Sequence, residues 1–364
     1  MLKKIQNAFI SQLNKYPILK NKLVHVIDFL FEFRKVAVGN VMRNPPYIKH
    51  VLKSKIIAKP GTLSFGALFN PGALVVDDHI LLLANAQKIP WFKTRGKNRK
   101  FYLEGQPVQF LLDKKSLKTV QEEIITNITG FPSENNWAIE DMRLFTWKGQ
   151  KMINHSFITK GKVGEFVNQT SVASAVSILD EKEKKFSFHA FPKLDLPLQN
   201  IEKNWIYKES ENRLFLFYSL NPYRVLVLED EENFTFKTLI NQQFDWKLKN
   251  PGNLKTMVSF STNPIDFDEE HFLMVVHQID HKITGRFYNH WAVLLDKKRM
   301  LPVKISEKPI FTGMGERGRT PGDRYISSIL KTDHEILFFA GEGDVFATVT
   351  KKSCENLISD MIDL

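Results

Sequence analysis

Cysteine is nearly absent from this sequence, with Cys354 as the only one in 364 residues. A single thiol excludes an intramolecular disulfide framework and any cysteine-rich zinc site, so the chain does not look built for an oxidising compartment. Long apolar runs are also missing. The most apolar early stretch, residues 23–33, is shorter than a bilayer span and carries three ionisable side chains. The first residues show no cleavable secretory signal, and we therefore expect a cytoplasmic protein.

Dense basic runs are scarce, although the chain as a whole is basic. The net charge is +11, from 51 Lys and Arg against 40 Asp and Glu, and only residues 93–100 (KTRGKNRK) concentrate positive charge. No nucleic-acid recognition motif accompanies this run, so we expect no nucleic-acid partner. A basic protein surface attracts anions, which favours a phosphate-bearing small molecule as a substrate.

Compact metal-binding patterns are lacking as well. The sequence HQIDH at 277–281 lacks the glutamate of the metalloprotease pattern and lies in a β-rich context rather than on a helix. His290 is too far along the chain to extend this group into a compact motif. We expect neither a metal ion nor an organic cofactor.

Material for a β-rich core is abundant: 43% of the residues are hydrophobic, and 29 are Phe. Residues 1 to about 50 have apolar residues at a helix-like spacing, which ends at Asn44-Pro45-Pro46. We therefore predict a helical extension at 1–55 and a β-domain at 56–364. We predict that this basic extension serves in packing or oligomerisation, or that it makes a peripheral contact with a membrane surface.

A repeat of about sixty residues organises the β-rich part of the chain. Each repeat opens with a polar cluster, runs into a strand and returns along a strongly apolar strand, and most continue into a second hairpin. The opening strand pairs are residues 69–86, 139–158, 201–220, 261–280 and 322–344. Four strands per repeat match one blade of a β-propeller. We predict an all-β, five-bladed β-propeller in which the first strand of each blade lies innermost.

Polar residues at the starts of these inner strands should converge on the central funnel of such a propeller. The clusters are Asn70, Glu140-Asp141-Arg143, Glu202-Lys203-Asn204, Ser261-Thr262-Asn263 and Asp323-Arg324, and later loops add Asn221, Tyr223, Arg224, His277, His290, Glu342 and Asp344. Carboxylates, amides and cations with aromatic neighbours are the composition expected of a sugar-binding site.

Four short motifs resemble those of glycoside hydrolase family 130: FNPGA at 69–73, IEDMR at 139–143, EKNW at 202–205 and AGEGD at 340–344. The resemblance spans roughly residues 60–350, in the family's order and with one motif per blade. These enzymes are five-bladed propellers, mostly phosphorylases or hydrolases of β-mannosides, and related propellers include transferases that use a sugar nucleotide. The chain departs from the family where EDMR replaces EDPR, and NPYR at 221–224 only loosely resembles the family's HR region.

The resemblance implies that Asp141 is the general acid, acting on the glycosidic oxygen through a hydroxyl of the bound mannose. It also implies that Asn70, Arg143, Asn204 and Asp344 hold the sugar and that Lys203 helps to bind phosphate. We add Glu140 and Tyr223 to the sugar-binding set because of their place at the funnel rim. Arg224 and His290 are our candidates for cations that would offset the repulsion between phosphate and Asp141.

A single acid suits phosphorolysis, because phosphate is already anionic, whereas an inverting hydrolase needs a second carboxylate to activate water. We therefore expect transfer of a mannosyl-type residue, by a β-mannoside phosphorylase or a related glycosyltransferase. The substrate would be an oligosaccharide or sugar phosphate, with inorganic phosphate or a sugar nucleotide as co-substrate. The alternatives are an inverting glycosidase, with Glu140, Glu202 or Glu342 activating water, and a glycan-binding propeller without catalysis. The oligomeric state, donor, acceptor and linkage stay open.

Overall fold

The structure is a computed structural model, and it describes residues 54–88, 106–131, 137–159, 172–246, 248, 257–282, 285–311 and 324–364. The chain divides into two compact units, one of residues 1–52 with 95–98 and one of residues 53–94 with 99–364. All described residues belong to the second unit. Residues 1–53 of the helical extension predicted at 1–55 lie outside the described residues. The structure of this extension and its membrane contact therefore stay predictions.

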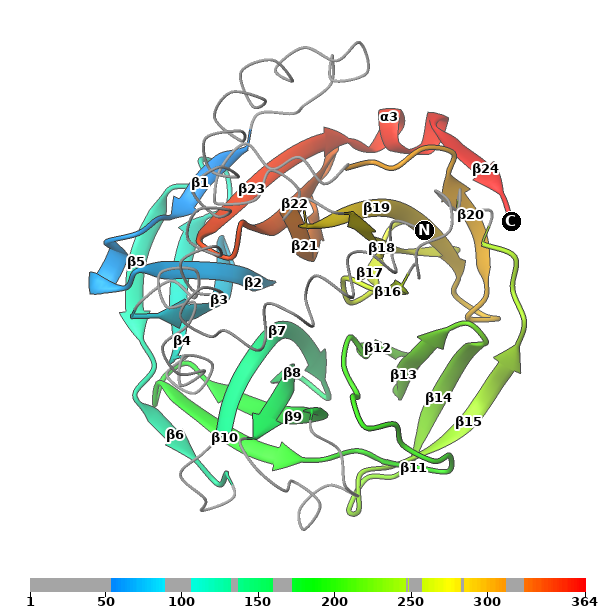
Figure 1. Ribbon diagram of the computed structural model, residues 1–364, viewed down its shortest axis with the longest axis horizontal. Helices are drawn as coiled ribbons and strands as arrows, with labels where there is room; N and C mark the ends of the chain where they lie inside the picture. Colours follow the sequence, from blue (N-terminus) through cyan, green and yellow to red (C-terminus); the bar gives the residue numbers. More distant parts are fainter. Residues whose placement is uncertain are drawn as a thin grey trace, which may run out of the picture. The chain divides into compact units, whose positions relative to one another are not determined.

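Within the described residues, the second unit contains five β-sheets around a common centre (Figure 1). Blade 1 contains β2 (Ala67–Val76), β3 (His79–Gln87), β4 (Gln106–Asp113) and β5 (Thr119–Ile124). Blade 2 contains β7 (Trp137–Trp147), β8 (Gln150–Thr159), β9 (Val172–Asp180) and β10 (Lys185–Ala190), with β6 (Asn127–Thr129) parallel to β10. Blade 3 contains β12 (Ile206–Ser210), β13 (Arg213–Leu220), β14 (Tyr223–Asp230) and β15 (Thr235–Gln242), with β11 (Lys193–Leu194) parallel to β15.

Blade 4 contains β16 (Met257–Phe260), β17 (Ile265–Asp266), β18 (His271–Lys282), β19 (Gly285–Asp296), β20 (Pro302–Ser306) and β24 (Met361–Asp363). Blade 5 contains β21 (Arg324–Lys331), β22 (Glu335–Glu342), β23 (Phe346–Ser353) and β1 (Lys55–Ala58). A short helix, α3 (Cys354–Ser359), and a 3-10 turn, η1 (Thr62–Ser64), complete the described elements. The predicted five-bladed β-propeller is confirmed, and the predicted opening strand pairs overlap the inner strands of the five blades, except that β16 of blade 4 lies before the predicted pair 261–280.

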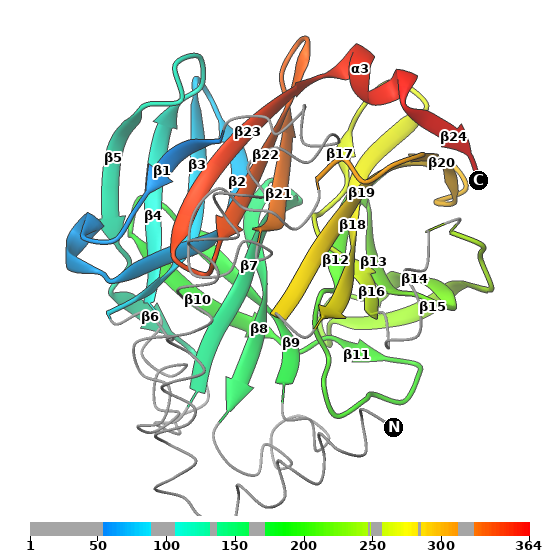
Figure 2. The same ribbon diagram turned by 45° about the horizontal axis from the view of Figure 1, so that its top comes forward.

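The ring is closed by a strand from the other end of the β-domain. β1 pairs antiparallel with β23, with Lys55 opposite Val349 and Ile56 opposite Thr348. Figure 2 shows β1 lying beside β23 at the outer edge of blade 5. The fourth strand of the last blade is therefore supplied by residues that precede the first blade, which the sequence repeat did not reveal.

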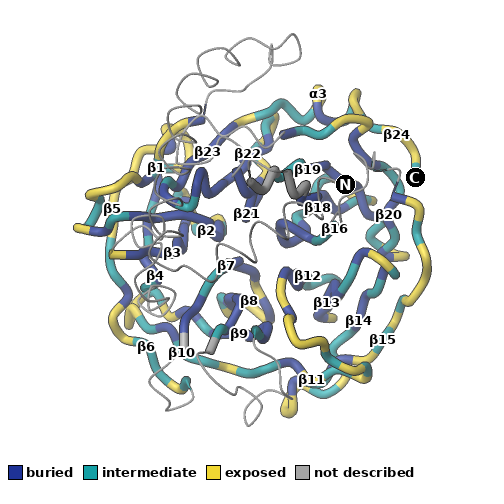
Figure 3. Tube along the Cα trace, viewed as in Figure 1, coloured by how far each residue is buried: buried dark blue, intermediate teal, exposed yellow. Residues whose placement is uncertain are grey.

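Apolar side chains on both faces of each blade join it to its neighbours. In β3, Leu81 and Leu83 pack in the cluster shared with blade 2, whereas Leu82 and Ala84 pack in the cluster shared with blade 5. This follows from the two-residue period of a strand, which sends successive side chains to opposite faces. Comparable buried clusters lie between the other neighbouring blades of the described chain. Figure 3 shows the inner strands largely buried and the exposed residues concentrated on outer strands and turns.

Candidate functional site

Arg143 connects the inner strands of four blades at the centre of the ring. Its side chain is 2% exposed. The Nε donates to the Ser261 carbonyl at 2.7 Å, one terminal nitrogen donates to the Asp141 carbonyl at 3.0 Å, and the other donates to Asn204 Oδ1 at 3.3 Å. The nitrogen that donates to Asn204 also donates to the hydroxyl of Tyr325. Blades 2, 3, 4 and 5 therefore meet at one guanidinium, as the convergence of inner-strand starts predicts.

Asn70 joins blade 1 to this centre by donating from its Nδ2 to Asp141 Oδ1 at 2.9 Å. Both residues lie where the strand register shifts, between Phe69 and Gly72 in β2 and between Glu140 and Arg143 in β7. Such bulges commonly re-aim a side chain beside an active site. The two inner strands thus present an amide and a carboxylate to each other.

Left-handed backbone conformations recur at the predicted sugar-binding residues. The φ angles are 48° at Asn70, 54° at Asp141, 63° at Asn204 and 50° at Asp344. Asn and Asp are the non-glycine residues that tolerate this region best, but each such position still costs about 1 kcal/mol or more. Strain of this kind is retained where the surrounding structure imposes it, and here it accompanies side chains gathered at one centre.

Two glycines of the sequence motifs allow this close approach. A Cβ on Gly72 would lie 2.6 Å from the Met142 carbonyl oxygen of β7, and a Cβ on Gly341 would overlap the Oδ1 of Asn70. No larger residue fits at either place without moving a neighbouring strand or Asn70. Gly72 of FNPGA and Gly341 of AGEGD are therefore explained by packing of blades 5, 1 and 2 against one another.

Carboxylates gather beside Asp141. Burial, followed by the negative charges of Asp141 and Asp344, raises the pKa of Glu140 to about 8, with Lys203 acting in the opposite direction. This coupling places residues of blades 2, 3 and 5 in one electrostatic cluster. At neutral pH Glu140 is protonated, so the cluster holds a proton next to Asp141.

Two buried histidines of blade 4 lie near the same centre. His277 on β18 and His290 on β19 are cross-strand partners with ring centroids 6.1 Å apart. The Ile326 N–H donates to His290 Nε2 at 3.1 Å, which leaves the proton of a neutral ring on Nδ1. Within the described chain, the Nδ1 atoms of both histidines have no hydrogen-bond partner.

The cationic role predicted for His290 does not fit its surroundings. Burial, followed by the charge of Arg324, lowers the pKa of His290 to about 3. Burial also lowers the pKa of His277 well below its usual value, with further contributions from His290, Arg143 and Lys203. Both rings are therefore neutral at physiological pH, and they can offer N–H donors but no positive charge.

The structure places Tyr223 away from the funnel. Its side chain is fully buried, its hydroxyl donates to the Met300 carbonyl at 2.6 Å, and its ring packs against Trp246 at a centroid distance of 5.8 Å. Tyr223 is thus a core residue between blades 3 and 4. Because it is the first residue of β14, the third strand outward from the centre, its proposed contact with a sugar is corrected to a packing role.

Arg224 also lies on β14 rather than on an inner strand. Its Nε donates to Asn241 Oδ1 at 3.1 Å on the outermost long strand of blade 3. In the part of the chain that the structure describes, no contact joins Arg224 to Asp141 or Lys203. The structure therefore brings together Asn70, Glu140, Asp141, Arg143, Lys203, Asn204 and Asp344, places His290 beside them as a neutral residue, and leaves Tyr223 and Arg224 apart.

Sequence reasoning missed Tyr325, whose hydroxyl accepts from Arg143 and donates to Asn204 Oδ1 at 3.3 Å. Burial raises its pKa to about 12, so it remains a neutral phenol. In the sequence, Tyr325 could have been found from its position directly after the polar pair Asp323-Arg324. Asp323 lies outside the described residues, and Arg324 forms a buried ion pair with Glu342 at 2.7 Å.

Among the described residues, no set of three or more His, Cys, Asp or Glu side chains is arranged to hold a metal ion. None of the described helices combines the length and apolar character needed to cross a membrane.

Comparison with known proteins identifies structural relatives but no relatives by sequence. No protein-family model matches the chain, and no curated protein matches it significantly. The fold is similar to that of β-1,2-mannobiose phosphorylase from Listeria innocua in complex with β-1,2-mannobiose, with a TM-score of 0.56, 13% identity, and coverage of 83% of this chain and 94% of that one.

Two further structures show the same likeness. MPT-4, a mannose phosphorylase from Leishmania mexicana in complex with a phosphate ion, matches with a TM-score of 0.57 and 12% identity over 87% of this chain and 93% of that one. A structure described under the GH130 family of mannoside phosphorylases, which contains glycoside hydrolases that target β-1,2 mannosidic linkages in Candida mannan, matches with a TM-score of 0.57 and 10% identity over 86% and 96%. At these identities the comparisons establish a shared fold.

Proposed function

We propose that this protein, whose five-bladed fold is shared with mannoside phosphorylases and hydrolases, is a carbohydrate-active enzyme that transfers a mannosyl-type residue to phosphate or between glycans. The observation that carries the proposal is the placement of Asp141 at the centre of the ring, held by Asn70 and surrounded by Glu140, Arg143 and Lys203. The structural relatives contain β-1,2-mannobiose in one case and phosphate in another, which supports a mannoside and an anion as ligands.

Asp141 is the proton donor in this proposal. Burial, followed by the charges of Asp141 and Asp344, keeps Glu140 protonated at neutral pH because it raises the Glu140 pKa to about 8, so a proton is held beside Asp141. This proton would move from Glu140 to Asp141, and Asp141 would then pass it through a sugar hydroxyl to the glycosidic oxygen. Asn70 would fix the orientation of the Asp141 carboxyl while the proton is transferred.

The acceptor step needs an anion held close to these carboxylates. Lys203 is exposed and near enough to Glu140 to lower its pKa, so it would bind phosphate at the mouth of the cluster. Phosphate oxygen would bond to the anomeric carbon while the glycosidic bond breaks and its electron pair leaves with the oxygen that Asp141 protonates. A single displacement of this kind inverts the anomeric configuration and requires no general base.

The hydrolase alternative requires a second carboxylate free to activate water. Glu342 is engaged by Arg324 at 2.7 Å and by Thr348 at 3.2 Å. Glu202 accepts from the Tyr218 hydroxyl at 2.9 Å. Glu140, protonated at neutral pH, is a poor base. These observations favour transfer to phosphate over hydrolysis, because phosphate is already anionic and needs no base.

The proposal is tested by incubating the protein with β-1,2-mannobiose and inorganic phosphate and measuring mannose 1-phosphate. A parallel reaction with GDP-mannose and the same disaccharide tests the transferase form through release of GDP. Release of mannose in phosphate-free buffer would identify a hydrolase instead. Saturable binding of the disaccharide without product under all three conditions would indicate a glycan-binding propeller and contradict the proposed catalysis.

Replacing Asp141 by Asn should lower turnover by about 10²–10⁴-fold, the usual contribution of a general acid. The melting temperature should change little, because Asn retains the shape and tolerates the left-handed φ of 54°. Asp77→Asn is a matched control, since Asp77 has a φ of 51° in the exposed β2–β3 turn. Equal activity of the Asp141 variant and the control would remove Asp141 from the mechanism.

A further inference from the structure

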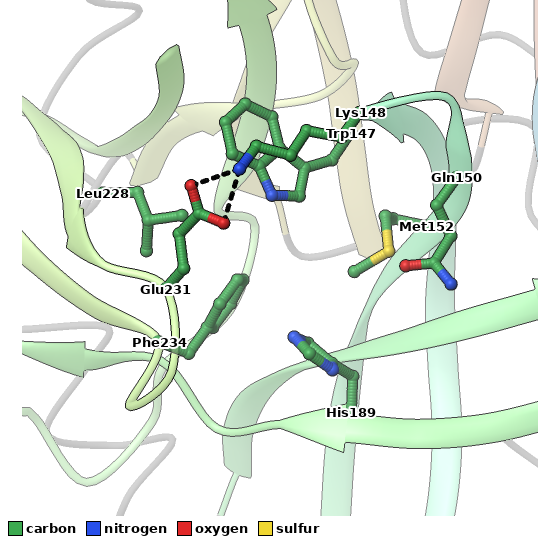
Figure 4. A pocket seen from close by; sticks show the side chains of 8 residues that line it. All are labelled: Trp147, Lys148, Gln150, Met152, His189, Leu228, Glu231 and Phe234. Carbon is green, nitrogen blue, oxygen red and sulfur yellow. Dashed lines mark hydrogen bonds and ion pairs between the residues drawn. The ribbon is translucent and has the colours of Figure 1, made fainter. Parts of the chain in front are cut away.

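A hollow lies at the C-terminal end of β7, away from Asp141 in the middle of the strand. Six residues separate Asp141 from Trp147, which is about 20 Å along a strand. There, blades 2 and 3 enclose a cavity of about 430 Å³ (Figure 4). This volume falls within the range of about 300–1,000 Å³ that is typical of small-molecule sites. The hollow is therefore separate from the carboxylate cluster and large enough for a ligand.

Aromatic rings and a thioether form the walls of this hollow. Trp147 and Met152 come from blade 2, and Phe234 comes from the β14–β15 turn of blade 3. His189 packs edge-on against Phe234, with centroids 5.0 Å apart and planes at 83°. Trp147, Met152 and Phe234 belong to the core cluster between the two blades, so the core fixes their positions. These three side chains are only 8%, 1% and 2% exposed, so they back the walls of the hollow, while the exposed His189 ring and the half-buried Leu228 present the apolar lining to a ligand.

An ion pair between the blades forms the polar side of the hollow. Lys148 Nζ lies 2.6 Å from each carboxylate oxygen of Glu231 and 5.3 Å from the centre of the Trp147 ring. Both charged side chains are 55% exposed, so they can turn hydrogen-bonding atoms toward a ligand. The Gln150 amide lines the same hollow. These three groups supply donors and acceptors suited to hydroxyls.

The charges in the hollow favour an uncharged ligand. The ammonium of Lys148 is neutralised by the carboxylate of Glu231, which it contacts through both oxygens. Burial lowers the pKa of His189, so its ring adds no positive charge at neutral pH. A phosphorylated ligand would find no uncompensated cation here, and a purely apolar ligand would leave the polar groups without partners.

We propose that this hollow binds a neutral sugar residue, as a second carbohydrate site distinct from the centre of the ring. The His189 ring and Leu228 contact the apolar face of the pyranose, while Lys148, Glu231 and Gln150 hydrogen-bond its hydroxyls. The proposal does not depend on catalysis at Asp141, since it uses none of the central residues. A glycan bound here would remain attached to the protein independently of turnover.

The test uses fluorine NMR of the full chain labelled with 5-fluorotryptophan, which gives a resonance for each of the six tryptophans. Trp147→Phe assigns the resonance at the hollow, and Trp205, next to Asn204, reports on the central site in the same spectrum. The probes are methyl β-D-mannopyranoside, β-1,2-mannobiose, mannose 1-phosphate and benzyl alcohol. We expect the neutral sugars to shift the Trp147 resonance saturably, whatever happens at Trp205 or in the activity assay.

Lys148→Asn should weaken this binding at least about tenfold, which corresponds to about 1.4 kcal/mol. Asn suits the φ of 50° at Lys148, so the turn is preserved. Lys184→Asn is the matched control: Lys184 also has a φ of 50°, lies in a turn of the same blade, and contacts Glu123 at 2.6 Å away from the hollow. This control should bind as the unaltered protein does.

Three results would overturn the proposal. The first is no saturable shift of the Trp147 resonance with neutral sugar up to about 100 mM, well above the millimolar affinity of a weak site. The second is equal affinity in Lys148→Asn and Lys184→Asn. The third is tighter binding of mannose 1-phosphate or benzyl alcohol than of the neutral sugars at Trp147, which would assign the hollow to an anion or to an apolar ligand.

Discussion

At the scale of single residues, one guanidinium and one carboxyl cluster define the candidate site. Arg143 is satisfied by Ser261, Asp141, Asn204 and Tyr325, so its charge is held in place and the inner strands are fixed around it. Such a satisfied network in a low-dielectric interior is rigid. The cluster around Asp141 is the reactive part, because burial, followed by the charges of Asp141 and Asp344, raises the pKa of Glu140 and keeps a proton on it.

The raised pKa of Glu140 predicts how stability depends on pH. Between the ordinary value of 4.5 and about 8, the folded chain keeps a proton that the unfolded chain has lost. Glu140 therefore contributes stability at low pH that is lost as pH rises through this window. Glu140→Gln, which stays neutral, should melt about 5 °C or more above the unaltered protein at pH 8 and show no such advantage at pH 5.

Thermal melts at half-unit steps from pH 5 to 9 measure this difference. Glu122→Gln, on the exposed face of β5, serves as the control and should follow the unaltered protein at every pH. A difference between Glu140→Gln and the unaltered protein that stays constant across the range would show that Glu140 is not protonated in the fold.

Sequence reasoning succeeded for residues whose position follows from strand order. It failed for residues whose role depends on burial or on their distance from the centre of the ring. Asn70, Asp141, Arg143 and Asn204 were grouped correctly because each lies near the start of an inner strand. Tyr223 was grouped with them because it was expected in a loop at the funnel rim, but no sequence pattern shows that its strand is third from the centre. The lost charge of His290 likewise depends on burial, which one sequence does not reveal.

At the scale of strands, close contacts between blades set the geometry of the site. β2 lies between β7 and β22, with Gly72 against the backbone of β7 and Gly341 against Asn70. The bulges at Asn70 and Asp141 re-aim side chains, but only because neighbouring strands leave space for them. Glycine at these positions is therefore a requirement of the site as well as of the fold.

Gly341→Ala should displace the Asn70 side chain and break its hydrogen bond to Asp141. We expect a loss of activity similar to that of Asn70→Ala, since both changes remove the same contact. In an Asn70→Ala background, adding Gly341→Ala should have a smaller further effect, because the overlap with the Asn70 amide is gone and the 2.9 Å approach to the backbone nitrogen of residue 70 remains. Activity and melting temperature of the two single variants and the double variant form a double-mutant cycle. Additive effects of the two changes would contradict this coupling.

The strand pairs of the repeat were predictable from alternating apolar residues and charged turns. The shortest strands were not: β6 and β11 contain three and two residues, too few to show any period. They pair in parallel with β10 and β15, and such pairings depend on the fold rather than on local sequence. Register shifts such as the one between Glu140 and Arg143 are also set by the neighbouring strand.

At the scale of the whole propeller, closure holds the five blades in one cooperative unit. β1 completes blade 5, and Lys55 Nζ also donates to the Ser116 and Leu117 carbonyls of blade 1 at 2.7 and 2.9 Å. The pairing of β1 with β23 joins residues almost three hundred positions apart in the chain. A local sequence pattern cannot specify such a contact. For this reason the sequence repeat did not predict the fourth strand of blade 5.

Removing β1 should therefore destabilise the ring. A chain that begins at residue 59 loses several strand hydrogen bonds of about 0.5–1.5 kcal/mol each relative to a chain that begins at residue 54. We expect its melting temperature to fall by roughly 5–15 °C, as measured by calorimetry of the two truncated chains. Equal melting temperatures would show that β1 does not contribute to closure.

In the proposed function, residues from separate blades form one sugar and phosphate site around Asp141. The most direct measurement is a crystal structure of the Asp141→Asn variant soaked with β-1,2-mannobiose and phosphate. We expect a mannosyl residue in contact with Asn70 and residue 141, and phosphate beside Lys203. A saccharide bound elsewhere on the propeller, with the centre empty under the same conditions, would contradict it.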